Sequence, residues 1–591
     1  MILQSLYKLY DRLADDPAYE IAKPGYAPQQ ITFRIILKPS GELFDITDAR
    51  LTDAKGKLRS QQRLCLGFEG ARSSGIKPYF LCDKSLYSLG YDTKEKDPVK
   101  LEKKFTAFRD KLLNAETQID DSDFSSVCKF LRNWSIEKAA EYLSQQDKDD
   151  FLQNGFGYFE IQGATLPIDQ LPKVKSWWDG QQSTSSRTTS QCLITGENAP
   201  IARLHSKIKG VVGGQAEQSL VSFNDRSYDS YCKDQSFNAP VSEQAAFKYS
   251  TALNSLLNGP KSNKHRIRIC DTTCVFWTEQ PSTVEDAASF FFSDGSNTPE
   301  TQDESARSKV EIFLKSLHLG TQVLDELGED TRSNHFYILG LAPNAARLSV
   351  RFFHQSTIAE FVANLRAHHD DISIIRQYNS EPELPSNSRL LEQTATKRSS
   401  GKIDYDTIPP LLAGSLMRAV LDNTPYPEDL YSAVLRRIRA DRTINYFRAS
   451  VIKGVLTRNH KQTMTTMLDI ENKEPAYLLG RLFSALEKTQ GDALGDLNAG
   501  LKDKFYSSAS ATPASVFPRI LRTYPHHLAK LNGGQKVVRE RLIQDIIGEL
   551  TEFPSHLNLK DQGKFAIGYY HQRKALFTKK SSITSETQES K

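Results

Sequence analysis

The chain has 591 residues, which is enough for about three to five domains. Its composition, with 39% hydrophobic and 25% charged residues, predicts a globular protein and excludes a wholly disordered one. No run of about 18 apolar residues occurs and charges interrupt the N-terminal segment, so we expect neither a membrane-spanning helix nor a secretory signal. Seven scattered cysteines favour free thiols in a reducing compartment, which indicates a cytoplasmic protein.

The net charge of +4 hides an uneven distribution of basic residues. Residues 55–84 carry seven basic and two acidic side chains, and residues 441–591 carry 23 basic and 15 acidic ones. Phosphate contacts act within about 10 Å, so local basic fields matter more for polyanion binding than the global charge. The distribution therefore favours a nucleic-acid partner about as strongly as the alternative, a surface that only keeps the protein soluble.

The periodicity of residues 1–180 predicts a mixed α/β N-terminal domain. The strongest strand signal is the apolar run 31–37, and a Pro-Gly turn at 24–25 precedes it. Helices are expected at 2–13, 94–113 and 124–143, and strands at 31–37, 42–46, 63–66, 79–81 and 158–161.

A polar linker at 181–191 leads into a mixed α/β central region, 191–405. Mobile loops are expected near 280–308 and 378–407, which are rich in polar residues. Strands are expected at 219–223, 274–277, 336–341 and 348–353.

From residue 408 onward strand signals fade, and the pattern predicts an all-α helical-bundle C-terminal domain, 408–591. The tail from 579 is expected to be disordered. The predicted fold class is therefore α+β, with mixed α/β N-terminal and central regions followed by this bundle. Helices are expected near 409–422, 427–440, 443–458, 475–489, 494–507, 515–530, 535–552 and 562–577.

Motifs that would indicate an enzyme are missing or weak. No P-loop and no G-x-S-x-G element occurs, and Cys270 and Cys274 lack a second pair for a structural zinc, so we expect no metal or cofactor. The run His368, His369, Asp370 and Asp371 could bind a metal in a nuclease, but a solvated helix end is the favoured interpretation.

A second candidate site surrounds the glycine pair Gly213-Gly214. Lys207 and Lys209 precede the pair, and Gln215 and Asn224 follow it. A glycine-hinged loop flanked by cations and amides suits approach to a phosphate backbone or a groove, although a tight turn with exposed lysines would give the same pattern.

Several passages resemble one family, in order and along nearly the whole chain. The passages are residues 1–13, 21–26, 72–83, 87–90, 192–197, 203–205, 208–215, 220–224, 237–243, 276–277, 336–353 and 565–573. The run FYILGLAPNAARLSVRFF at 336–353 is the most specific. Together they resemble the large subunit of the type I-C CRISPR surveillance complex, Cascade.

This resemblance implies a non-catalytic subunit that recognises the protospacer-adjacent motif (PAM) in duplex DNA, helps to open the duplex and stabilises the R-loop. The implied partners are the CRISPR RNA, the target duplex and its displaced strand, the Cascade backbone and 5′-handle subunits, and a helicase-nuclease. Guide pairing would supply the remaining sequence specificity. In this family a small subunit is made by internal translation, and Met464 and Met467 are the candidate starts here.

Three sets of residues are candidates for DNA contact. The first set, for the PAM, is Lys23, Arg72, Ser73, Ser74 and Lys77. The second is Lys207, Lys209, Gln215 and Asn224. The third, for the displaced strand along the bundle, is Arg436, Arg437, Arg439, Arg442, Arg448, Lys453 and Arg458. A solvated helix face is the alternative for the third set, and the alternative functions are the metal-dependent nuclease or a purely structural scaffold.

Overall fold

The computed structural model divides the chain into two compact units. Unit 1 consists of residues 1–210, 214–262 and 343–348, and unit 2 of residues 211–213, 263–342 and 349–591. The structure describes residues 1–53, 56–67, 76–95, 97–144, 149–153, 155–181, 188–215, 217–269, 271–285, 288, 321–326, 328–495 and 499–578. Mixed α and β elements with a helical C-terminal region confirm the predicted fold class.

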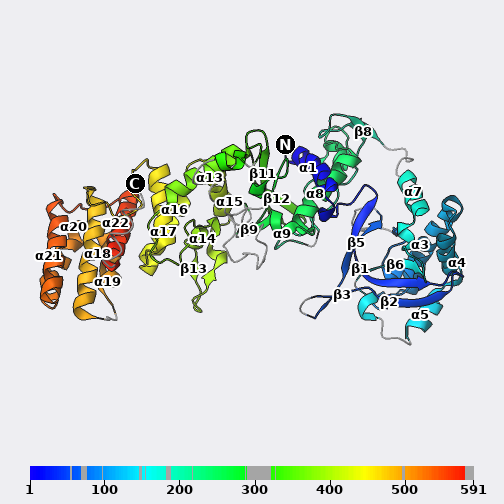
Figure 1. Cartoon of the computed structure of the whole chain (residues 1–591), viewed down its shortest axis with the longest axis horizontal. Coiled ribbons are helices and arrows are strands. Elements are labelled where there is room, and N and C mark those ends of the chain that lie inside the picture. The colour runs from blue at the N-terminus through cyan, green and yellow to red at the C-terminus, as the bar shows by residue number, and fades with distance from the viewer. Residues whose placement is uncertain are drawn as a thin grey trace. The chain divides into compact units, whose positions relative to one another are not determined.

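Strand β1 (Tyr26–Leu37) organises the main sheet of unit 1 (Figure 1). Its C-terminal half pairs antiparallel with β2 (Leu43–Asp48) and parallel with β6 (Phe156–Ile161). Its N-terminal half pairs antiparallel with β5 (Gln61–Leu66). The continuous apolar run in β1 fits a strand that is buried by neighbours, as the sequence predicted.

Helices α3 (Pro98–Ile119) and α4 (Ser122–Asn133) share a hydrophobic core with this sheet. Phe33 of β1, Phe108 of α3 and Phe124 of α4 are each fully buried in it. Asp97 and Asp121 begin the two helices by accepting hydrogen bonds from backbone N–H groups of their first turns. The single helix predicted at 124–143 is wrong, because the chain leaves helical geometry at Trp134 before α5 (Ile136–Ser144) starts.

Two helices that are far apart in the sequence pack against each other in unit 1. Helix α1 (Ile2–Asp15) packs against α8 (Glu243–Asn258), and Lys248 of α8 lies 2.6 Å from the Asp11 carboxylate. The remaining elements are β3 (Leu51–Thr52), β4 (Leu58–Arg59), α2 (Ser85–Ser88), α6 (Asp149–Leu152), α7 (Pro172–Gln181), β7 (Thr189–Gln191) and β8 (Asn198–Pro200).

Unit 2 begins with an antiparallel sheet in the order β12-β11-β10-β9. Phe336 of β11 stacks on Phe361 of α13 with ring centroids 4.0 Å apart, which joins the sheet to the first helix after it. The strands predicted at 274–277, 336–341 and 348–353 are confirmed. Their bounds are β9 (Arg266–Ile269), β10 (Thr272–Thr278), β11 (His335–Asn344) and β12 (Arg347–Thr357).

Two other strand predictions are wrong. Residues 219–223 contribute only an isolated bridge from Ser219 to Arg347, and residues 79–81 form an irregular segment in which Leu81 has φ +61°. Both runs are apolar enough to look like strands, but among the described residues neither forms a continuous ladder with a neighbouring strand.

Helices dominate the rest of unit 2 and confirm the predicted bundle. None of the described helices combines the length and the hydrophobicity of a membrane span. The polar stretch 378–407 contains α14 and the short pair β13–β14. The bounds are α9 (Ser262–His265), α12 (Gln322–Glu326), α13 (Ile358–Ile372), α14 (Asn387–Glu392), β13 (Thr396–Lys397), β14 (Ile403–Asp404), α15 (Leu412–Leu421), α16 (Glu428–Asp441), α17 (Tyr446–Arg458), α18 (Pro475–Leu494), α19 (Leu501–Ala509), α20 (Pro513–Leu528), α21 (Gly533–Gly548) and α22 (Leu559–Phe577).

Helices α18 and α22 approach each other through two glycines. A Cβ atom on Gly480 would lie 2.0 Å from the carbonyl oxygen of Phe565, and one on Gly568 would lie 2.2 Å from that of Tyr477. Neither backbone can move aside without displacing a whole helix, because the two helices share one tightly packed core. Close backbone approach is therefore the reason that glycine occupies both positions.

Gly480→Ala should lower the free energy of unfolding of unit 2 by about 3 kcal/mol, the upper part of the usual range for overpacking. Gly491→Ala is the matched control in the same helix, since no atom lies within 4 Å of its added Cβ. The control should be neutral or more stable by up to about 1 kcal/mol. Chemical denaturation of the full chain measures both, and equal effects would contradict the proposed packing.

Candidate nucleic-acid interface

Lys23 lies at the first position of a tight turn that leads into β1. The N–H of Tyr26 donates to the Lys23 carbonyl at 2.9 Å, and Gly25 adopts φ +84°. Proline at the second position and glycine at the third give a type II turn, in which the glycine is required by the positive φ. The Lys23 side chain is exposed.

The carbonyl of Gly25 fixes this turn to the end of β5. It accepts hydrogen bonds from the indole N–H of Trp178, at 2.8 Å, and from the N–H of Gly67, at 3.0 Å. Trp178 is 4% exposed, so its hydrogen bond is shielded from water. The turn therefore lies beside the point from which the chain departs toward Arg72.

The chain returns from that departure through a constrained segment. Tyr79 packs against Gly67, where a Cβ atom would meet its ring at 2.6 Å. Leu81 is buried with φ +61°, a conformation that costs free energy for a non-glycine residue. The buried Asp83 carboxylate stabilises it by accepting from the N–H groups of Tyr79, at 2.8 Å, and Lys84, at 2.7 Å. We call the turn 23–26, Leu66–Gly67 and the segment 76–84 the loop base.

The loop base presents cations at its surface. Lys23, Lys77 and Lys84 are exposed, whereas Lys111 donates to the carbonyl of Pro78 at 2.9 Å. Burial, followed by Asp179, raises the pKa of Tyr26 to about 12, so its hydroxyl stays protonated as a donor to that carboxylate.

Two arginines of the basic stretch 55–84 have internal partners instead. Arg63 lies 2.6 Å from the buried Asp169 and stacks over Tyr158 at 4.0 Å. Arg59 lies 3.1 Å from Asp53. The local charge count of the sequence therefore overstates the number of cations available to a partner.

The first candidate set is partly brought together. Lys23 lies on the turn and Lys77 on the returning segment of the loop base, while Arg72, Ser73 and Ser74 lie outside the described residues. Sequence reasoning missed Trp178 and Asp83. Trp178 is one of four tryptophans and Asp83 is one of two acids in the basic stretch 55–84. The sequence does not show that Trp178 donates to Gly25 or that Asp83 accepts from Tyr79 and Lys84.

The second candidate set is spread over two places. Lys207 donates to the hydroxyl of Ser219 at 2.6 Å, and Lys209 lies 3.2 Å from Glu217. Gln215 is exposed near them. Asn224 instead accepts from Arg347, whose guanidinium also stacks over Tyr228 at 4.6 Å.

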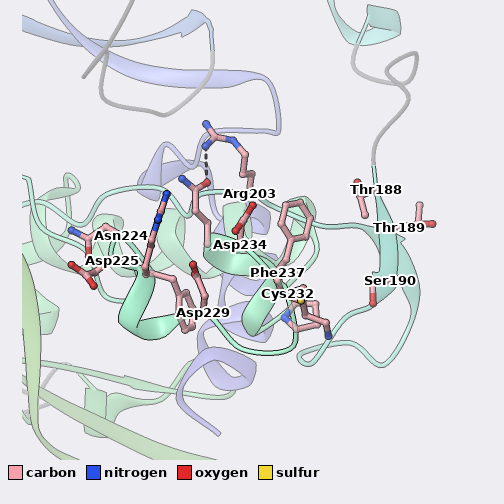
Figure 2. Close-up of a pocket in the computed structure, with 15 residues that line it drawn as sticks. Thr188, Thr189, Ser190, Arg203, Asn224, Asp225, Asp229, Cys232, Asp234 and Phe237 are labelled. Atoms are coloured by element: carbon pink, nitrogen blue, oxygen red, sulfur yellow. Dashed lines mark hydrogen bonds between the residues drawn. The ribbon is translucent and has the colours of Figure 1, made fainter.

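Asn224 also lines an open pocket of about 830 Å³ in unit 1 (Figure 2). Tyr231, Cys232 and Gln235 all have positive φ in the segment beside it, and the Asn238 side chain holds this segment by accepting from Ser230 and donating to the carbonyls of Lys233 and Gln235. Arg203 donates to Gln235 at 2.6 Å, and both residues line the pocket. The charged residues of the lining are three cations, Arg203, Arg226 and Lys233, and three carboxylates, Asp225, Asp229 and Asp234. This balance does not favour a polyanion.

The third candidate set is largely internal to unit 2. Only Arg436 and Arg442 are exposed. Arg437 and Arg448 share the Asp441 carboxylate, and Arg439 donates to Gln562. The two remaining members are buried: the Lys453 ammonium donates to the carbonyls of Asp370 and Asp371 at 3.0 Å, and Arg458 lies 2.5 Å from the Asp371 carboxylate. The cationic helix pattern thus largely marks internal ion pairs and helix caps, which sequence periodicity could not distinguish from a surface.

The histidine–aspartate run lies in the last turns of α13, and the expected solvated helix end is wrong for its first residue. His368 is fully buried, and its Nδ1 lies 2.7 Å from the Tyr426 hydroxyl. Burial, followed by the nearby Arg458, lowers the pKa of His368 to about 3, so the ring is neutral. The Asp371 carboxylate forms an ion pair with Arg458. Among the described residues no group of three or more His, Cys, Asp or Glu side chains could hold a metal ion.

The described cysteines are free thiols, and Cys270 lies outside the described residues. Burial raises the pKa of the Cys274 thiol. Burial also raises the pKa of the Cys192 thiol, but hydrogen bonds from Ser242 and Thr195 have the larger, opposite effect. Together they lower the pKa of Cys192 to about 7.

These features define a class: a chain of two α+β units, with a helical C-terminal region and exposed lysines on the loop base. The family model described as CRISPR-associated protein (Cas_Csd1) matches residues 6–577, so the chain belongs to this family. A search of curated proteins found no match. The resemblance to a CRISPR-associated family is thus confirmed over nearly the whole chain.

Trp178→Phe should loosen the turn at Lys23, because it keeps the ring and removes the N–H that donates to Gly25. We expect a loss of about 1 kcal/mol of stability and faster amide exchange around Gly25 and Gly67, measured by hydrogen–deuterium exchange. Trp177→Phe is the control, since that indole donates to the exposed Gln118 at 2.8 Å. Unchanged exchange at both glycines in Trp178→Phe would contradict this anchoring role.

Proposed function

We propose that this chain is the non-catalytic large subunit of a type I-C RNA-guided surveillance complex. In this role it recognises the PAM in duplex DNA, aids opening of the duplex, stabilises the R-loop and helps to recruit a helicase-nuclease in the cytoplasm. The family match supports the CRISPR context. The proposal that the chain recognises the PAM rests on the loop base.

The loop base suits PAM recognition because it is rigid and cationic at once. Lys77 follows the stretch that contains Arg72, Ser73 and Ser74, residues with the donors that phosphates and base edges accept. Lys23 lies on the turn that is hydrogen-bonded to Gly67, the last described residue before this stretch. The strained Leu81, stabilised by Asp83, fits the tendency of functional sites to hold backbone in uncommon conformations. Fixed ends reduce the ordering cost of binding, which favours discrimination between base sequences.

Lys23→Ala and Lys77→Ala should each reduce the preference of the assembled complex for the correct flanking trinucleotide by roughly 10- to 100-fold, the range typical of lost base contacts. The measurement compares binding to matched duplexes with correct and permuted flanks at two salt concentrations. Lys129→Ala, at an exposed lysine of α4, is the control and should change nothing.

Two other outcomes of this experiment would assign different roles to Lys23 and Lys77. Uniform weakening of all duplexes with a salt slope reduced by about one would make these lysines phosphate contacts, and the second candidate set would become the reader. No change in either variant would support a purely structural scaffold and refute the assignment to the loop base.

We further propose that translation from Met464 or Met467 yields a separate small subunit. Both methionines lie between α17 and α18, and the two products would have 128 and 125 residues that include α18–α22. Such a product keeps its own aromatic core, in which Phe483 contacts Tyr506, Phe517 and Phe565 with ring centroids 5.8 to 6.4 Å apart. A fragment with an intact core can fold as an independent bundle.

Combined Met464→Leu and Met467→Leu substitutions should remove this fragment from the native complex, as measured by intact-mass spectrometry. Met417→Leu is the control at the remaining internal methionine, and it should leave the fragment level unchanged. A complex without any such fragment, or an unchanged level in the double variant, would refute internal initiation.

A further inference from the structure

A small pocket in unit 2 lies where the end of α22 meets the segment after α13. It has a volume of about 340 Å³, within the range of roughly 300–1,000 Å³ that small-ligand sites occupy. We call it the α22 pocket; its lining residues are Gln377, Tyr378, Tyr570, Arg573, Lys574 and Phe577. This lining contains two cations and no carboxylate, in contrast to the balanced charges of the larger pocket in unit 1.

Two aromatic rings of the α22 pocket are exposed to solvent, although neighbouring residues hold each of them in place. Tyr378 is 62% exposed and Phe577 is 57% exposed. The backbone N–H of Tyr378 donates to the Glu381 carboxylate at 2.9 Å, and the Arg573 guanidinium and the Lys488 ammonium lie 4.9 Å and 4.7 Å from the centroid of the Phe577 ring. Rings held in water in this way offer faces for stacking at a low ordering cost.

The two cations of the lining are positioned by bonds that use few of their N–H groups. Lys574 donates to the carbonyl of Gln377 at 2.9 Å, and Arg573 lies 3.4 Å from Glu487. The same Glu487 carboxylate accepts a stronger bond from Tyr569, at 2.6 Å. An ammonium has three N–H donors and a guanidinium has five, so both groups keep donors for an anion.

We propose that the α22 pocket binds one unpaired nucleotide of single-stranded DNA, with the base stacked on Tyr378 and Phe577 and the phosphate at Arg573 and Lys574. Alternating exposed rings and cations are the usual composition of single-strand binding sites. The choice of DNA rests on the proposed function, in which the displaced strand supplies unpaired nucleotides. A product that starts at Met464 lacks Gln377 and Tyr378, so the site is complete only in the full chain.

The test is binding of fluorescein-labelled oligodeoxythymidylate to the full-length chain, followed by fluorescence anisotropy. Tyr378→Ala and Phe577→Ala should each weaken binding roughly 5- to 150-fold, the range expected for loss of one base-stacking contact. Tyr378→Phe keeps the ring and should bind like the parent chain. Tyr231→Ala is the control, because Tyr231 is 95% exposed but lies in unit 1.

A second probe separates stacking from charge. An abasic oligonucleotide of equal length keeps the phosphates, so it should bind the parent chain and both alanine variants equally. Arg573→Ala with Lys574→Ala should weaken binding of both oligonucleotides and reduce the salt dependence. Thermal unfolding of each variant verifies that the fold is retained.

Three results would overturn this proposal: no binding of oligodeoxythymidylate by the parent chain, unchanged binding by both alanine variants, or tighter binding of oligouridylate, which would assign the pocket to RNA. None of these results depends on flank recognition. Loss of flank discrimination in the complex, in turn, leaves this measurement unaffected, so the two proposals fail separately.

Discussion

The pairing of strand β1 with three neighbours is the constraint on which the candidate interface depends. Its N-terminal residues pair with β5, so the turn that contains Lys23 and the end of β5 must lie side by side. The Gly25 carbonyl holds the turn and the end of β5 together, because it accepts hydrogen bonds from the indole N–H of Trp178 and the backbone N–H of Gly67. The described residues before and after 68–75 are therefore both held, Gly67 by the Gly25 carbonyl and the segment 76–84 by the Asp83 carboxylate.

In unit 2 the main constraint is the close packing of helices that carry many arginine and lysine side chains. Glycines at 480 and 568 let α18 and α22 approach closely, and the resulting core excludes water. Cations near such a core are stable only with close partners, since an unpaired buried charge costs several kcal/mol. Arg458 with Asp371, and Lys453 with two carbonyls at the end of α13, meet this requirement.

The sequence predicted secondary structure well where periodicity and burial agree, as in β1, β10–β12 and the helices of the C-terminal region. The strand predictions failed at 79–81 and 219–223, where an apolar run forms no continuous ladder, because a sequence pattern alone cannot show which strand lies opposite. Of the candidate residues, Lys23 and Lys77 are exposed, as composition and turn chemistry predicted, and their role in DNA contact stays a prediction. The role of Trp178 was not predictable, because its indole donates to Gly25, 153 positions away. The role of Asp83 was not predictable, because its carboxylate supports an unusual backbone conformation at Leu81.

The sequence by itself determined the fold class, the tight turn at Lys23, the helical character of the C-terminal region and, through the order of its matched passages, the family. These properties depend on local patterns and on residue identity. Only the tertiary structure decided which cations face solvent and which form internal ion pairs, and which aromatic rings remain exposed at the α22 pocket. The physical reason is that the burial of a charge or a ring depends on the elements packed around it, and those elements come from distant parts of the chain.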